Sequence, residues 1–278
     1  MKIFKNIITL ILAFLLMLSI LLTVAVQIVS TTILNKDYIL GKLEEANYYN
    51  NVYEQIKDSF EGYIGPSGLD ESVLENIYTR DQVKDDINSI IDNIYENKNN
   101  KINTEDIKEK LQKNIESSVA TGILTKETQK SIENFTDKIA DEYVQNISHD
   151  PYFGKLGTII NKVNNILEKV EGVIIFIPII LAVVILLINI KELSMAIRFI
   201  AISVLSSGII ALVEKLFIQT KINISNILII NDSFSEVIKN IINNILGSIN
   251  TMSIVAIVGG IIVIILTNVI KINRQTIE

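Results

Sequence analysis

The stretch that decides the fold is residues 154–191, which read GKLGTIINKVNNILEKVEGVIIFIPIILAVVILLINIK. In its first half, apolar side chains recur at alternating steps of four and three residues, which is the stripe that one helix packs along another. The second half, Val173–Ile190, is an unbroken apolar run that is long enough to cross a membrane. Since no turn signal separates the halves, the sequence predicts one long helix that starts in water and ends in a membrane, kinked at Pro178.

Three further apolar runs accompany this one. They are Ile7–Val29, Phe199–Val213 and Met252–Ile270. The third run along the chain, Phe199–Val213, reaches spanning length when it is extended to residues 195–216, so the sequence predicts four spans. The first run is longer than the 7–15 apolar residues of a cleaved signal peptide, which favours an uncleaved signal anchor over the alternative of cleavage after Ala25.

The orientation of the spans follows from the basic residues near their ends, since cytoplasmic segments are enriched in Lys and Arg. A cytoplasmic N-terminus gives every inner segment two basic residues: Lys2 and Lys5, Lys191 and Arg198, Lys271 and Arg274. We therefore expect a multi-pass protein of the cell membrane with both termini in the cytoplasm.

The segment between the first and second spans predicts a separate helical domain outside the cytoplasm. Its apolar residues recur with helical period, and Thr79 and Gln82 form a capping box before one of the expected helices. Between Ser30 and Gly172 the sequence has 16 Lys and Arg against 26 Asp and Glu, so the charge of this segment is 16 − 26 = −10. There is no cysteine in the chain, which excludes disulfides and requires this domain to rely on its own core.

The predicted fold class is therefore all-α: a four-span helical membrane protein with a large extracytoplasmic helical bundle between spans 1 and 2, in which span 2 continues from a long amphipathic helix. The expected divisions are a signal anchor (1–29), an acidic helical domain (30–172) that includes a stalk helix (155–172), span 2 (173–190), span 3 (195–216), a short outer segment (217–251) with an amphipathic helix (233–250), span 4 (252–270) and a cytoplasmic tail (271–278).

A possible internal duplication links two of these divisions. Shifting residues 159–190 by 79 positions onto 238–269 gives 11 identities in 32 positions, including Asn164 and Asn165 on Asn243 and Asn244. The sequence therefore raises the hypothesis that a helix-into-membrane unit occurs twice.

A glycine-rich stretch inside the outer domain is the candidate partner-contact loop. It breaks the helical pattern and consists of Gly62, Tyr63, Gly65, Pro66 and Gly68 with their neighbours. Loops of this kind carry binding surfaces, although a simple turn has the same sequence signature. All nine tyrosines also lie in this domain, either as core residues or as anchors for a sugar or a protein.

Small and polar residues at four-residue steps in the spans predict close packing between helices, because small side chains let backbones approach in lipid. For the polar row of the first span, the alternative is that it lines a conduction path. The candidate interhelical residues are Ser19, Thr23, Gln27, Ser203, Ser207, Ala256 and Gly260.

Signals of catalysis are scarce. The one histidine, His149, stands beside Asp150 and Pro151 at an expected helix end, where a turn residue is the simpler interpretation than an acid or base. A zinc site is not expected with one histidine and no cysteine, and the acidic groups at Asp81–Asp86 and Asp137–Glu142 lack the spacing of a calcium loop. We expect no catalytic residue, no metal and no cofactor.

Three classes of function are compatible with this sequence. The favoured one is a non-catalytic membrane protein of the cell envelope whose outer domain binds a protein partner, in a scaffold, assembly or sensory role. The alternatives are a channel or transporter subunit that uses the polar face of span 1, and a membrane enzyme or its accessory subunit. The expected partners are the lipid bilayer, an envelope protein and a second copy of the chain in a homo-oligomer, with no nucleic acid.

Overall fold

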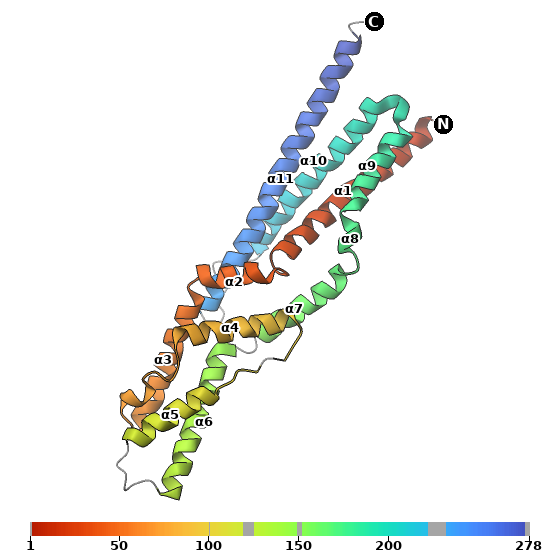
Figure 1. Cartoon of the computed structure of the whole chain (residues 1–278). Coiled ribbons are helices and arrows are strands. Elements are labelled where there is room, and N and C mark those ends of the chain that lie inside the picture. The colour runs from red at the N-terminus through yellow and green to blue at the C-terminus, as the bar shows by residue number, and fades with distance from the viewer. Residues whose placement is uncertain (1, 100, 119–124, 149–151, 222–231, 276–278) are drawn as a thin grey trace. The chain divides into compact units, whose positions relative to one another are not determined.

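The computed structural model describes residues 2–99, 101–118, 125–148, 152–221 and 232–275. Within these ranges the regular elements are all helical (Figure 1). The chain divides into two compact units. Unit 1 consists of Met1–Asn35, Asn164–Leu228 and Ile238–Glu278, and unit 2 of Lys36–Val163 and Ile229–Val237.

Unit 1 contains the long apolar helices. They are α1 (Lys2–Thr31), α8 (Glu171–Ile174), α9 (Phe176–Ile188), the 3-10 turn η2 (Ile190–Glu192), α10 (Leu193–Lys221) and most of α11 (Asp232–Gln275). Within the described ranges, three segments are long and apolar enough to cross a membrane: Ile3–Thr31, Ile190–Lys221 and Phe234–Val269. A fourth is added if the broken pair Leu156–Leu167 and Gly172–Ile188 counts as one span.

Contacts between the helices of unit 1 show their directions. The Thr9 side chain meets Asn189 and the Thr23 side chain meets the Ile174 carbonyl, so α1 runs antiparallel to α8 and α9. The α1 helix runs parallel to α10, because Lys5 pairs with Glu192 just before α10, and Ser203 bonds to the Ala13 carbonyl. These helices enclose a small apolar core of Ala13, Leu16, Ile185 and Ala196.

The prediction of one helix from Gly154 to Lys191 is wrong. The helix α7 (Tyr152–Leu167) ends at Leu167, and a turn at residues 168–170 separates it from α8 and α9. The apolar stripe is no longer buried beyond this point, because Leu167 is 7% exposed whereas Val170 is 38% exposed. In addition, Gly172 lowers the helix propensity of the following turn.

The predicted kink at Pro178 is also wrong. Pro178 is the third residue of α9, inside the first turn of a new helix. The first four backbone N–H groups of a helix have no acceptor within it, so a proline there removes no hydrogen bond.

The amphipathic helix expected at 233–250 and the span expected at 252–270 are parts of the single 44-residue helix α11. Residues 159–190 are broken where the aligned residues of α11 are continuous, so the two segments do not share a backbone path. The duplication hypothesis therefore has no support from the structure.

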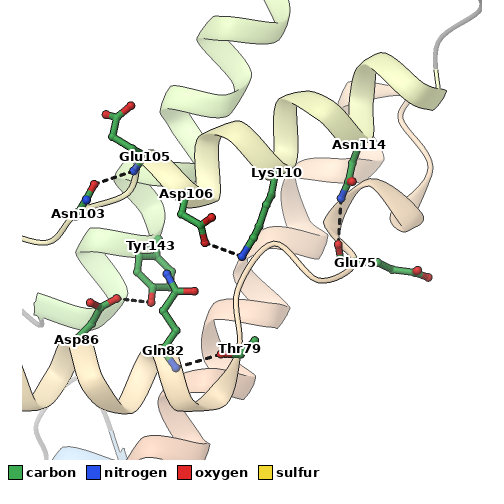
Figure 2. A network of polar contacts seen from close by, with 10 residues as sticks. All are labelled: Glu75, Thr79, Gln82, Asp86, Asn103, Glu105, Asp106, Lys110, Asn114 and Tyr143. Carbon is green, nitrogen blue, oxygen red and sulfur yellow. Dashed lines mark hydrogen bonds and ion pairs between the residues drawn. The ribbon is translucent and has the colours of Figure 1, made fainter.

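Unit 2 is a helical bundle. Its elements are α2 (Lys36–Glu45), α3 (Tyr48–Ser67), the 3-10 turn η1 (Glu71–Leu74), α4 (Arg80–Tyr95), α5 (Glu105–Ser118), α6 (Lys126–Ser148), most of α7 and the first residues of α11. The N-cap half of the capping box is confirmed, since the Thr79 hydroxyl accepts the Gln82 N–H at 3.1 Å (Figure 2). The predicted apolar face of α4 is confirmed as well, with Val83, Ile87, Ile90, Ile91 and Ile94 all buried. Residues 149–151, expected as a helix end, lie outside the described residues.

Candidate functional site: an acidic aromatic pocket in unit 2

A pocket of about 350 Å³ lies between α3 and the segment that follows it through η1 to Tyr78. It is lined by aromatic rings and by charged side chains. The lining residues are Tyr53, Lys57, Phe60, Glu61, Glu71, Ser72, Leu74, Glu75, Asn76 and Tyr78.

One wall of the pocket is a single face of α3. Tyr53, Lys57, Phe60 and Glu61 are separated by four, three and one residues, so they project from the same side of the helix. Phe60 is buried, at 1% exposed, and attaches this face to the core. The α3 wall is therefore apolar at Phe60, where it meets the core, and charged at Lys57 and Glu61, which form its part of the rim.

The opposite wall is irregular backbone held by side-chain caps. The Asp70 carboxylate accepts the Ser72 N–H at 3.0 Å and starts η1. Asn76 then adopts a left-handed conformation, with φ of 61°, which asparagine tolerates better than most residues.

A residue from α5 fixes the same wall from behind. The Asn114 amide donates to the Val73 carbonyl oxygen at 2.9 Å. It also donates to the Glu75 carbonyl oxygen at 3.0 Å (Figure 2). These bonds fix the backbone of the segment that carries Glu71 and Glu75. The Cα positions of both glutamates at the rim are therefore defined.

Aromatic rings form the floor of the pocket. The ring of Tyr78 lies 5.2 Å from that of Tyr53 and 5.4 Å from that of Phe60, measured between centroids. Behind it, Tyr143 lies 5.9 Å away and donates its hydroxyl to the Asp86 carboxylate at 2.7 Å (Figure 2). The cluster connects the pocket to the core of unit 2.

The electrostatic field in the pocket is negative. The lining has three glutamates and one lysine, and Lys57 lies 3.8 Å from the Glu61 carboxylate. Burial raises the pKa of the Tyr78 hydroxyl, and the neighbouring Tyr53, Glu54, Glu61 and Asp58 raise this pKa further. Tyr78 therefore stays neutral and is surrounded by acidic groups.

The predicted contact loop is corrected by the structure. Gly62, Tyr63, Gly65 and Pro66 lie inside α3, which continues to Ser67, and the chain turns only at Gly68, whose φ is 72°. Helix formation overrides the glycines because Val52, Ile56, Phe60 and Ile64 bury one face of the same helix.

Tyr63 belongs to a contact with α6 rather than to the pocket. Its hydroxyl donates to the Glu142 carboxylate at 2.9 Å, and the Lys138 ammonium lies 5.0 Å from its ring centroid. The pocket instead uses the residues on either side of the glycine-rich stretch. Sequence reasoning missed Tyr53, Phe60, Glu71, Glu75 and Tyr78 as a set, because only the fold brings the end of η1 to α3.

Several of the predicted interhelical residues lie where the helices of unit 1 meet. Ser203 donates to the Ala13 carbonyl at 2.7 Å, and Thr23 donates to the Ile174 carbonyl at 3.1 Å. A Cβ placed on Gly260 would lie 2.8 Å from the Leu205 Cβ, which shows how closely α10 and α11 approach.

The remaining predicted residues differ in their surroundings. Ala256 lies at the same helix crossing, 3.0 Å from a Cβ placed on Gly208. Ser207 is buried and bonds to the Val204 carbonyl within its own helix, and Ser19 bonds likewise to the Leu16 carbonyl. Gln27 is exposed, so this member of the polar row does not contact another helix with most of its side chain.

A polar contact that the sequence did not point to joins α1 with the end of α9. The Asn189 amide donates to the Thr9 hydroxyl at 3.0 Å and to the Ile185 carbonyl at 2.9 Å. Both side chains belong to fully buried residues.

The two acidic groups considered for calcium have separate partners. Asp86 accepts from Tyr143, Asp137 pairs with Lys108 at 2.7 Å, and Glu142 accepts from Ser59 at 2.5 Å. Among the described residues there is no group of three or more His, Cys, Asp or Glu side chains that could hold a metal ion. His149 lies outside these residues.

Comparison with known proteins adds no family to this description, because no protein-family model, curated protein or solved structure matches the chain.

Proposed function

We propose that this chain is a non-catalytic integral membrane protein of the cell envelope whose helical unit 2 binds a partner outside the cytoplasm through the acidic aromatic pocket. The observation that carries the proposal is the pocket itself. It combines about 350 Å³ of space with a buried aromatic floor and a charged rim, the composition by which binding sites anchor and orient a ligand.

Membrane attachment follows from the outward faces of unit 1. Large apolar side chains point away from the helix contacts, including Phe4 at 69%, Leu10 at 61% and Val255 at 67% exposed. An exposed apolar surface of this kind is unfavourable in water and favourable in lipid. The alternating directions of α1, α9, α10 and α11 are consistent with four crossings and with both termini in the cytoplasm.

Binding is favoured over catalysis by the pocket's chemistry. Its carboxylates stand on the rim beside aromatic rings, and the one serine in the lining, Ser72, hydrogen-bonds to the Asp70 carboxylate as part of the cap that starts η1. This arrangement suits the capture of a side chain or small molecule.

A channel or transporter role is less favoured, because the polar row of α1 is occupied within the protein. Thr23 donates to the carbonyls of Ser19 and Ile174, and Ser19 donates to that of Leu16. Flux through purified protein in liposomes that falls on replacing Ser19 and Thr23 would support the channel over the binding role.

The binding role is tested by site-specific photo-crosslinking in cells that express the full chain. A photoreactive amino acid in place of Glu71 should give a discrete adduct, whereas the same residue in place of the exposed Glu109 on α5 should not. An adduct pattern that is identical at both positions, or the absence of any adduct at Glu71, would contradict the proposal.

A further inference from the structure

We infer that the acidic aromatic pocket is specific for an organic cation, an ammonium or guanidinium group. This inference rests on the proposed function, since it names the ligand class of the same pocket.

The charge balance of the rim is the first argument. Lys57 is the one basic side chain in the lining, and it already faces Glu61 at 3.8 Å. Glu71 and Glu75 make no ion pair with any part of the chain that the structure describes. Two carboxylates therefore remain available, and both stand on backbone that Asn114 and the cap at Asp70 hold in place.

The aromatic floor is the second argument. A cation placed over the face of a tyrosine ring is attracted by the ring's negative face, which a neutral or anionic ligand is not. Tyr53 and Tyr78 lie 5.2 Å apart between ring centroids, so the pocket that the carboxylates line also offers aromatic surface.

The chain itself contains an example of this recognition on the same ring. The Arg80 guanidinium lies 5.0 Å from the centroid of Tyr53 and donates to the Glu54 carboxylate at 2.9 Å. A guanidinium thus already pairs with this tyrosine and with a glutamate on α3. The pocket repeats the combination with Tyr53, Tyr78, Glu71 and Glu75, the two glutamates that make no ion pair with a described residue.

Tyr78 supplies a further polar atom. It is 9% exposed, it lines the pocket, and its hydroxyl makes no hydrogen bond with another described residue. A neutral phenol oxygen can accept an N–H from a bound cation, which adds a directional contact to the charge attraction.

The inference is tested by titration calorimetry on the full chain in a non-ionic detergent, at low salt. The probes are agmatine, the blocked tripeptide acetyl-Ala-Arg-Ala-amide and, as a neutral control, acetyl-Ala-Gln-Ala-amide. We expect saturable binding of a cationic probe, weakened by added NaCl, and no binding of the glutamine peptide. Binding of agmatine alone assigns the site to a free small cation, and binding of the arginine peptide assigns it to a partner's side chain.

Variants give the sign of each contribution. Glu71→Gln with Glu75→Gln should weaken binding about tenfold, and Lys57→Gln should strengthen it about twofold, since it removes a competing cation. Tyr53→Leu should weaken binding about two- to fivefold. Glu109→Gln, which removes one negative charge from an exposed position of α5, should leave binding unchanged. Circular dichroism melting of each variant identifies any that fail to fold. Misfolding cannot explain stronger binding by the Lys57→Gln variant, because a misfolded pocket would bind the cation less tightly.

The inference is overturned if neither cationic probe binds saturably, or if binding is the same in the Glu71→Gln, Glu75→Gln variant. Its failure can be distinguished from failure of the proposed function. A specific crosslink at Glu71 without cation binding retains the partner and rejects the cation. If neither a specific crosslink at Glu71 nor cation binding is found, the pocket is rejected as a binding site.

Discussion

At the scale of single residues, Glu142 on α6 shows how unit 2 uses its acidic side chains. The carboxylate accepts hydrogen bonds from the Ser59 hydroxyl at 2.5 Å, the Tyr63 hydroxyl at 2.9 Å and the Asn146 amide at 3.2 Å. These bonds, that from Ser59 most of all, lower the pKa of Glu142 although partial burial acts in the opposite direction. The charged form therefore holds α3 against α6.

The first prediction concerns the replacement Glu142→Gln. The lowered pKa means that this carboxylate stabilises the fold above the ordinary glutamate pKa of about 4.3, and that the contribution disappears as the pH falls through the lowered value. At pH 7 the variant should lose about 1 kcal/mol of unfolding free energy, allowing for partial exposure of the site. Below the lowered pKa the difference from the original protein should shrink.

Urea unfolding of the full chain in micelles at pH 7 and at pH 3 measures both effects. The matched control is Glu133→Gln, an exposed position on the same helix. Equal stabilities of the two variants at pH 7 would show that the Glu142 contacts contribute nothing.

A second prediction at this scale concerns the buried pair Thr9 and Asn189. In lipid a hydrogen bond between helices contributes about 0.6 kcal/mol on average and up to about 2 kcal/mol. A double-mutant cycle with Thr9→Val and Asn189→Ala should give a coupling energy in this range, measured from unfolding in mixed micelles. The cycle of Asn189→Ala with the exposed Thr220→Val should give none, and zero coupling for Thr9 would refute the contact.

At the scale of elements, the contact between α10 and α11 depends on two glycines. A Cβ on Gly208 would lie 2.8 Å from the Ser253 carbonyl oxygen, and one on Gly260 would lie 3.0 Å from the Ala201 carbonyl oxygen. Backbone atoms cannot move aside as a flexible side chain can, so the helices approach this closely only where a side chain is absent.

The third prediction compares two adjacent glycines of α11. Gly260→Ala should destabilise unit 1 by about 1–3 kcal/mol, because the added methyl overpacks the contact with α10. Gly259→Ala should be neutral or stabilising by up to about 1 kcal/mol, since its Cβ meets nothing within 4 Å and alanine is the better helix former. Thermal unfolding of both variants in the same detergent decides the matter, and equal melting temperatures would contradict the packing.

At the scale of the whole molecule, the number of crossings decides on which sides of the membrane the termini lie. Among the described residues the structure has three helices of spanning length, and a broken pair adds a fourth only if it counts as one span. An even number places both termini on one side, whereas three crossings place them on opposite sides.

The fourth prediction uses the absence of cysteine, which makes single cysteines clean reporters. In intact cells a membrane-impermeant maleimide should label Glu71→Cys, in unit 2, and should label Thr276→Cys or a cysteine placed after Met1 only once the membrane is opened. Labelling of one terminus but not the other in intact cells would mean that the broken pair does not cross.

The sequence by itself predicted those features that depend only on residues close together in the chain. Helix hydrogen bonds join residues four apart, so the 3.6-residue period of α4, the Thr79 cap and the long apolar helices were all predictable from neighbouring residues. The same locality explains the errors. The end of α7 at Leu167 and the continuation of α3 through Gly65 depend on which turns are covered by other helices, and that information is not in the stretch itself.

The tertiary structure alone decided which distant residues meet. Tyr53 faces Tyr78, Ser203 reaches the Ala13 carbonyl and Asn189 reaches Thr9 across gaps of 25, 190 and 180 positions. Such contacts are the joint result of packing every apolar face at once, so no single periodicity encodes them. The pocket was invisible in the sequence for this reason: its floor comes from the core of unit 2, and its rim from two segments that the glycine-rich end of α3 brings together.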